Sequence, residues 1–307
     1  MPRGRNLFTP QRFQIAHSPD ADDAFMFFAL TQGHVRVQGP EPCVCDVVSA
    51  DIQTLNLRAL AGGPDMLQIS AAAYPAVADR YRITGCGASM GLNYGPVVVA
   101  HERLLPGQLQ SARVAIPGEL TTAYLLARIY LPAFKPVPMA FDTVLDAAVE
   151  NRVDAAVVIH EGQLTYADHG LNKVIGLGER WFEDTGLPLP LGINVVSRRL
   201  EFAWQQGLAE ALAESIIYAH DNSASALAYA RTFARGIDED RSDEFTHMYV
   251  NDLTRGMGER GVAGLRALFT RARSAGIVGE IPTLDVLHLP GGTPSSSQNR
   301  RMPPVTP

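Results

Sequence analysis

Short apolar runs of strand length alternate with longer helical stretches along most of this chain, and this alternation constrains the fold more than any other feature. The predicted strands are residues 13–17, 66–70, 96–100, 112–116, 155–160 and 193–197. The predicted helices are residues 23–32, 52–61, 121–130, 143–150, 202–220 and 262–275. Such alternation is typical of an α/β fold in which helices flank a largely parallel sheet.

Two of the predicted strands differ from the others and suggest crossings between two lobes. In GPVVVA at 95–100 and LGINVVS at 191–197, a glycine comes before a run rich in β-branched residues, and the segments on either side differ in character. If both cross, residues 101–192 form an inserted smaller lobe, and residues 1–100 with 193–290 form a larger discontinuous lobe, with a hinged cleft between them. The last stretch, 291–307, is rich in Gly, Pro and Ser and is predicted to be a disordered tail.

Length and composition allow two hydrophobic cores and argue against several classes of protein. The length of 307 residues exceeds the usual domain size of roughly 100–200 residues, and 46% of the residues are hydrophobic, which is enough for two cores. The net charge of −6, with no dense Lys/Arg cluster before the tail, argues against nucleic-acid binding. No apolar window of about 18 residues predicts a membrane span. The N-terminal segment lacks the apolar stretch of a secretory signal, so we expect a cytoplasmic protein.

The three cysteines, Cys43, Cys45 and Cys86, do not form a recognisable metal or redox motif. They are an odd number, and C-x-C alone is neither a zinc site nor the redox pattern C-x-x-C. We therefore expect free, buried or incidental thiols. No cluster of His, Cys, Asp and Glu has metal-ligand spacing, so no metal is predicted.

The segment HSPDADDAFMFFAL at 17–30 places the end of a strand directly before a helix. The first N–H groups of a helix lack intrahelical acceptors and lie at its partly positive end, so this junction can bind an anion. Ser18 and Asp23 are the candidate binding residues. The alternative is that Ser18 or one of the aspartates only caps the helix, which would explain the same residues without a ligand. The loop lacks the turn glycine and closing glutamate of an EF-hand, which argues against calcium.

A second junction, IPGELTTAYLL at 116–126, runs through Gly118 into a helix headed by Thr121 and Thr122. Glycine lets the backbone approach a ligand closely, and the threonine hydroxyls with the helix-terminal N–H groups form a cradle for a carboxylate. A threonine N-cap is the alternative explanation. The place of this turn near the start of the inserted lobe favours ligand binding, because such turns face the cleft in open α/β sheets.

The segment DAAVVIHEG at 154–162 carries the candidate general base, His160. Apolar residues 155–159 predict a strand buried on both faces, and its carboxyl end is where ligands of α/β folds bind. Histidine suits a general base at neutral pH because its ordinary pKa is about 6.5. A structural or merely solvated histidine is the alternative. Glu161 points the other way if the strand continues, so it is a weaker candidate.

The segment DMLQISAAAY at 65–74 ends a predicted strand in Ser70, followed by small residues that leave room for a ligand. Ser70 is a candidate hydrogen-bond donor. It is not expected to be a nucleophile, because its surroundings do not match G-x-S-x-G. The glycine-rich stretch 87–95 matches neither the phosphate-binding loop nor the dinucleotide-binding pattern.

Taken together in their order and spacing, SPDADDAFMFFAL, DIQTLN, TTAYLL, VVIHEGQLTYADHGL and WFEDTGLPLPLG resemble the 1,4-dihydroxy-6-naphthoate synthases of the futalosine route to menaquinone. The resemblance covers residues 13–285. It implies a two-lobed, periplasmic-binding-protein-like (type II) α/β fold. It also implies a cofactor-free lyase that converts cyclic dehypoxanthinylfutalosine, a small anionic aromatic substrate, to 1,4-dihydroxy-6-naphthoate and dihydroxyacetone. By motif, it makes His160 the base and adds Thr121, Thr122, Ser70 and Asn56 as binding residues.

The chain departs from this family at its opening motif. The familiar pattern is S-P-C-P-N-D-T-F, whereas this chain has Asp20, Ala21, Asp22 and Ala24 at the four differing positions. A carboxylate at Asp22 that pointed inward would repel an anionic substrate. The alternatives are a non-catalytic solute-binding protein on the same fold and the sister enzyme chorismate dehydratase, which shares the pattern SP-x-x-x-D-x-F. The sequence leaves monomer and dimer open.

Overall fold

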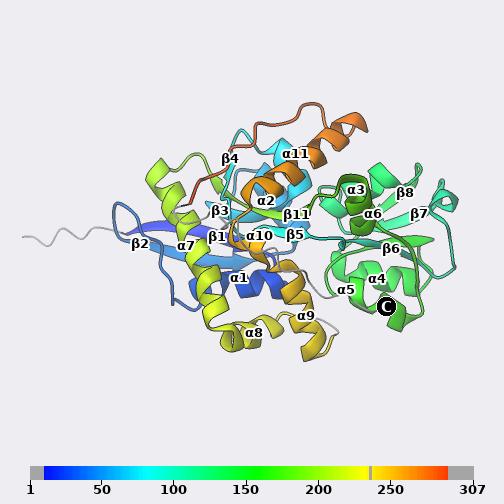
Figure 1. Ribbon diagram of the computed structural model, residues 1–307, viewed down its shortest axis with the longest axis horizontal. Coiled ribbons are helices and arrows are strands. Elements are labelled where there is room, and N and C mark those ends of the chain that lie inside the picture. The colour runs from blue at the N-terminus through cyan, green and yellow to red at the C-terminus, as the bar shows by residue number, and fades with distance from the viewer. Residues whose placement is uncertain (1–9, 235–236, 290–307) are drawn as a thin grey trace, which may run out of the picture.

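The structure is a computed structural model that describes residues 10–234 and 237–289. Its strands form two sheets that lie beside each other in Figure 1. The first sheet has the order β2 (Cys43–Ser49), β1 (Gln11–His17), β3 (Met66–Ser70), β11 (Leu189–Ser197) and β4 (Tyr81–Ile83), with β5 (Ser89–Gly91) also paired to β11. The second has the order β10 (Asn172–Gly176), β6 (Val97–Ala100), β9 (Ala155–Val158), β7 (Arg113–Ile116) and β8 (Lys135–Pro138).

The chain passes from the first sheet to the second between β5 and β6, and it returns between β10 and β11. Both sheets are mixed, so the prediction of a largely parallel sheet is wrong. The reason lies in the returning strands: β11 runs antiparallel to β3, β4 and β5, and β6 runs antiparallel to β9 and β10. The remaining pairs, β1 with β2 and β3, and β7 with β8 and β9, are parallel as predicted.

Helices surround both sheets. They are α1 (Ala21–Thr31), α2 (Ile52–Leu60), α3 (Thr122–Tyr130), α4 (Phe141–Val149), α5 (Gly162–Thr165), α6 (Leu177–Thr185), α7 (Phe202–Asp221), α8 (Ser223–Arg231), α9 (Glu239–Tyr249), α10 (Asp252–Arg255) and α11 (Gly258–Ser274), with short 3-10 turns at Ala71–Ala76, Pro106–Leu109 and Tyr166–His169. In Figure 1, α3 to α6 accompany the second sheet at the right, and the other helices accompany the first. None of the described helices is long and apolar enough to cross a membrane.

Helix α1 is enclosed by protein along almost its whole length. Residues 21–30 are all buried, and the helix packs against α7, α8 and α9. The reason is the run AFMFFAL, which gives the helix apolar side chains on every face, and such a helix is stable only inside a protein. Its fixed position anchors the aspartates of its first turn.

All twelve predicted elements are present, with ends shifted by no more than four residues. The predicted disordered tail, 291–307, lies outside the described residues. The three cysteines are free, as expected, and Cys86 is buried while the other two are partly buried.

Candidate active site

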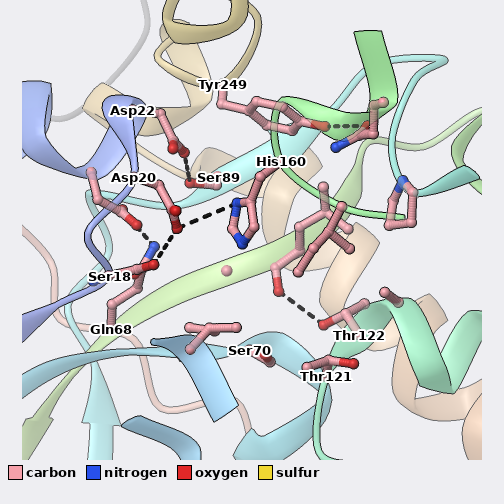
Figure 2. A pocket seen from close by; sticks show the side chains of 18 of the residues that line it. Ser18, Asp20, Asp22, Gln68, Ser70, Ser89, Thr121, Thr122, His160 and Tyr249 are labelled. Atoms are coloured by element: carbon pink, nitrogen blue, oxygen red, sulfur yellow. Dashed lines mark hydrogen bonds and ion pairs between the residues drawn. The ribbon is translucent and has the colours of Figure 1, made fainter. Parts of the chain in front are cut away.

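A cavity with an empty volume of about 570 Å³, part of it open to solvent, is lined by residues from elements of both sheets. Its wall includes the segment between β1 and α1, the end of β3, the first half of β11, the first turns of α1 and α3, and the segment after β9. Six of the seven sequence-predicted site residues line this cavity: Ser18, Asp23, Ser70, Thr121, Thr122 and His160. Figure 2 labels five of them, all but Asp23, and shows their side chains around one space.

The seventh predicted residue, Asn56, lies behind Ser70 and not on the cavity wall. Its side chain is fully buried, its Nδ2 donates to Ser70 Oγ over 3.0 Å, and its Oδ1 accepts from the Ser70 backbone N–H over 2.8 Å. Because Ser70 Oγ accepts this bond, its own hydrogen remains to be donated elsewhere. Asn56 therefore orients Ser70 as a donor toward the cavity.

The first turn of α3 supplies the second polar end of the cavity. Thr121 is the N-cap residue, as the alternative explanation of the motif required: its Oγ1 accepts from Tyr124 N over 3.2 Å and donates to Gly118 O over 2.8 Å. Thr122 Oγ1 donates to Leu191 O over 2.8 Å and accepts from Ala72 N over 3.1 Å. Among the described residues, no atom accepts a hydrogen bond from the backbone N–H groups of Thr122 and Ala123. These two groups are therefore available to bind a ligand.

His160 lies two residues beyond the end of β9, in a turn and not in the strand itself. Its backbone has a φ of 53°, in the left-handed region that residues other than glycine rarely adopt. Such backbone strain persists where surrounding structure over-determines it, and it is concentrated at functional sites. The imidazole is 19% exposed, its Nδ1 lies 3.3 Å from Asp20 Oδ2, and the Phe141 ring packs edge-on against it with 5.1 Å between centroids.

Three buried aspartates form an acidic wall at the first turn of α1. The N-cap residue, Asp20, makes no side-chain capping bond, and it accepts a hydrogen bond from Ser18 Oγ. Capping is therefore not the role of these side chains. Ser89 Oγ donates to Asp22 Oδ2 over 3.0 Å, and Gln68 Nε2 donates to Asp23 Oδ1 over 2.5 Å (Figure 2). Asp22 thus lies on the cavity wall and does not face away from it.

The acidic wall carries less negative charge than its sequence suggests. Burial, and next the negative charge of Asp20, raise the pKa of Asp22 to about 7, although His160 and the Ser89 hydrogen bond act in the opposite direction. Burial and the charges of Asp22 and Asp20 raise the pKa of Asp23 well above its ordinary value. At neutral pH, Asp22 is therefore divided between its two forms, and Asp23 holds its proton more tightly than an ordinary carboxyl does.

The described residues that line the cavity include no lysine or arginine. An anionic ligand must therefore be held by hydrogen-bond donors and by the positive end of a helix, as at the start of α3. In the part of the chain that the structure describes, no group of three or more His, Cys, Asp or Glu side chains is arranged to hold a metal ion.

Sequence reasoning missed several residues of the cavity wall, notably Gln68, Ser89, Gln163, Phe245 and Tyr249. A signal existed for Gln68: it is polar within the apolar run MLQIS, and it shares a strand face with Ser70 two residues later. Phe245 and Tyr249 come from α9, far along the chain, and no local pattern joins them to the other site residues. Tyr249 Oη donates to Gln163 Oε1 over 2.9 Å, which links α9 to α5.

Comparison with solved structures shows the fold. A solved protein from Archaeoglobus fulgidus matches with a TM-score of 0.82 and 43% sequence identity, over 87% of this chain and 98% of that one. A Candida albicans protein described as having the generic periplasmic binding protein fold matches with a TM-score of 0.67 at 13% identity, over 92% of this chain and 99% of that one. The predicted periplasmic-binding-protein-like α/β fold is confirmed.

Comparison of sequences shows the family. The 1,4-dihydroxy-6-naphthoate synthase of Thermus thermophilus is 37% identical over 272 residues, which cover 89% of this chain and 98% of the relative. The enzyme of the same name from Streptomyces coelicolor is also 37% identical, over 86% of this chain and 94% of the relative. The profile of a protein family described as menaquinone biosynthesis matches residues 13–274. The chain therefore belongs to the menaquinone biosynthesis family.

Proposed function

We propose that this protein is a 1,4-dihydroxy-6-naphthoate synthase, a carbon–carbon lyase with His160 as its general base. Its substrate is cyclic dehypoxanthinylfutalosine, and its products are 1,4-dihydroxy-6-naphthoate and dihydroxyacetone. Family membership and two synthase relatives matched over nearly their whole length support the enzyme class. The observation that carries the assignment of the base is the position of His160, on the cavity wall in a strained turn and beside a buried carboxylate.

The substrate carboxylate binds at the first turn of α3. The N–H groups of Thr122 and Ala123 and the hydroxyl of Ser70 supply donors there, and Figure 2 places Ser70 beside the two threonines. The hydroxyls of Thr121 and Thr122 act indirectly: they form hydrogen bonds to backbone atoms and hold this turn in place. The partial positive charge of the helix end stabilises the anion in the absence of a lysine or arginine among the described wall residues.

The hydroxyl-bearing, sugar-derived part of the substrate lies against the acidic wall. Carboxylate oxygens accept hydrogen bonds from hydroxyl groups, and a protonated carboxyl can also donate one. This orientation keeps the substrate carboxylate away from Asp20 and Asp22 and explains how an acidic first turn of α1 is compatible with an anionic substrate.

The chemistry begins when His160 removes a proton from the substrate. Electrons then move toward aromatisation of the naphthalene ring, and the carbon–carbon bond to the sugar-derived fragment breaks. Apolar side chains on the wall, among them Ile52, Leu191 and Phe245, limit the water that can reach the reacting carbon. We further propose that the part of the chain from β6 to α6, which is built on the second sheet, and the rest of the chain act as two lobes that close over the substrate in the cytoplasm.

Incubation of the purified protein with cyclic dehypoxanthinylfutalosine tests the proposal directly. We expect formation of dihydroxynaphthoate and dihydroxyacetone, detected by liquid chromatography and mass spectrometry, without added cofactor. A parallel incubation with chorismate tests the dehydratase alternative. Binding of the naphthoate product without any turnover of either substrate would favour the solute-binding alternative and would contradict the synthase assignment.

A further inference from the structure

We propose that Asp20 is a positioning residue that orients the His160 ring and makes Nε2 its basic nitrogen. The inference rests on the proposed role of His160 as the base.

The geometry around Asp20 fixes one of its carboxylate oxygens against the imidazole. Asp20 is 2% exposed, and its Oδ2 lies 3.3 Å from His160 Nδ1. The same oxygen accepts the hydroxyl hydrogen of Ser18, and the Ser18 backbone N–H in turn donates to Gln68 Oε1 over 3.1 Å. The oxygen that faces His160 is therefore held in place by a chain of buried hydrogen bonds (Figure 2).

The chemistry of the two groups decides which imidazole nitrogen carries the proton. An ionised carboxylate only accepts hydrogen bonds, and a neutral imidazole has one N–H and one bare nitrogen. Contact between Nδ1 and the carboxylate is favourable only if Nδ1 carries the hydrogen. Nε2 is then bare and able to take a proton from the substrate. Once it does, the imidazolium is positive, and the Asp20 carboxylate 3.3 Å from Nδ1 compensates this charge beside a described wall without lysine or arginine.

The two residues come from different sheets. Asp20 follows β1 of the first sheet, whereas His160 follows β9 of the second. The Phe141 ring, also from the second-sheet side, contacts the imidazole and restricts its rotation. The orientation of the base therefore depends on a contact made between the two halves of the fold, and it is correct only when those halves are held together around the cavity.

The tautomer of His160 is the most direct readout, and it requires no substrate. Long-range ¹H–¹⁵N correlation spectra distinguish the two neutral tautomers, and a His160→Asn sample assigns the signals among the eight histidines. We expect wild-type protein above neutral pH to carry the hydrogen on Nδ1. In Asp20→Asn, the amide can instead donate to Nδ1, so we expect the hydrogen to move to Nε2. In steady-state assays, kcat should fall about tenfold to a thousandfold while KM changes by less than about threefold.

Asp46→Asn is the matched control, because it removes an exposed carboxylate that pairs with Arg12 outside the cavity. It should leave both the tautomer and kcat unchanged. Asp20→Ala is a second test that removes the carboxylate without adding an ionisable group, and the same shift of tautomer is expected if Asp20→Asn does not fold.

A wild-type His160 that carries its hydrogen on Nε2 would overturn the inference without reference to any variant. So would Asp20 variants that fold and retain both the wild-type tautomer and kcat. Failure of the synthase proposal is distinguishable from both results. In that case the wild-type protein does not turn over cyclic dehypoxanthinylfutalosine, whereas the tautomer measurement still decides the role of Asp20.

Discussion

Asn56 holds Ser70 by two hydrogen bonds at once, one to the side-chain hydroxyl and one to the backbone N–H. Because the oxygen and the nitrogen of this fully buried amide both bond to Ser70, the Ser70 hydroxyl is held in one orientation, toward the cavity. The resemblance of the sequence to a known family pointed to Asn56 as a binding residue. The structure gives it an indirect position, one residue removed from the cavity wall.

Ser70→Ala should weaken substrate binding, and it should also lower stability somewhat, because the buried Asn56 Nδ2 loses its acceptor. The variant removes the hydroxyl donor and keeps the bond from the Ser70 backbone to Asn56. Loss of a hydrogen bond to a charged group costs about 1.5–3 kcal/mol, so KM should rise at least tenfold. Asn56→Ala is the comparison: it keeps the Ser70 hydroxyl but leaves the buried Ser70 backbone N–H without its partner, so it should lower the melting temperature while KM rises less than in Ser70→Ala. An unchanged KM in Ser70→Ala would remove Ser70 from the binding site.

Thr121→Val should destabilise α3 and weaken binding together. The substitution removes the cap on Tyr124 N, and loss of an N-cap costs about 0.5–2 kcal/mol. The N–H groups of Thr122 and Ala123 are then less well ordered, so KM should rise while kcat changes less. Thr121→Ser retains the capping oxygen and is the control for both effects. If Thr121→Val lowers the melting temperature but leaves KM at the wild-type value, the first turn of α3 does not hold the substrate carboxylate.

Asp22→Asn should abolish a pH dependence of ligand binding. Because the pKa of Asp22 is raised to about 7, the wild-type wall gains negative charge as the pH rises through 7, and affinity for an anionic ligand should fall. Asparagine preserves the shape and can still accept from Ser89. Calorimetric titration with the naphthoate product from pH 6 to 8.5 should therefore show a steeper loss of affinity for wild type than for the variant. Equal slopes would show that the charge of Asp22 does not reach the ligand.

The same variant should change how the free energy of unfolding depends on pH. An aspartate whose pKa is higher in the folded state binds its proton more tightly there, so its stabilising contribution is complete below about pH 4 and is lost as the pH rises through about 7. Between pH 5 and 8, wild-type stability should decline more than that of Asp22→Asn. Asp23→Asn should act in the same direction, because burial also raises the pKa of Asp23. Denaturant unfolding at several pH values measures this, and parallel curves would contradict it.

Sequence patterns predicted the central strands and long helices well because burial there enforces apolar periodicity, as in β3 and α7. They missed β8, whose sequence is KPVP, because two prolines argue against a strand. The structure accommodates them because β8 lies at the edge of its sheet. They also missed the three-residue strands β4 and β5, which are too short for a period to be recognised.

The candidate site was predictable where a residue ends a strand, closely follows one or caps a helix, as at Ser70, His160 and Thr121 respectively. It was not predictable where the partner comes from a distant segment. The contact between Asp20 and His160 joins residues that are 140 positions apart, and no local pattern specifies it. The effect of burial on Asp22 and Asp23 likewise depends on helices that follow much later in the chain.

Turnover by His160→Asn tests the central claim most directly. Asparagine cannot take a proton near neutral pH, and it tolerates the left-handed backbone conformation of this position better than most residues. The variant should fold, melt near the wild-type temperature and bind the naphthoate product. Its turnover of cyclic dehypoxanthinylfutalosine should fall by at least about 100-fold, the lower end of what a positioned base contributes. Turnover within a few-fold of wild type, or a loss of activity that only follows a collapse in melting temperature, would contradict the assignment of His160 as the base.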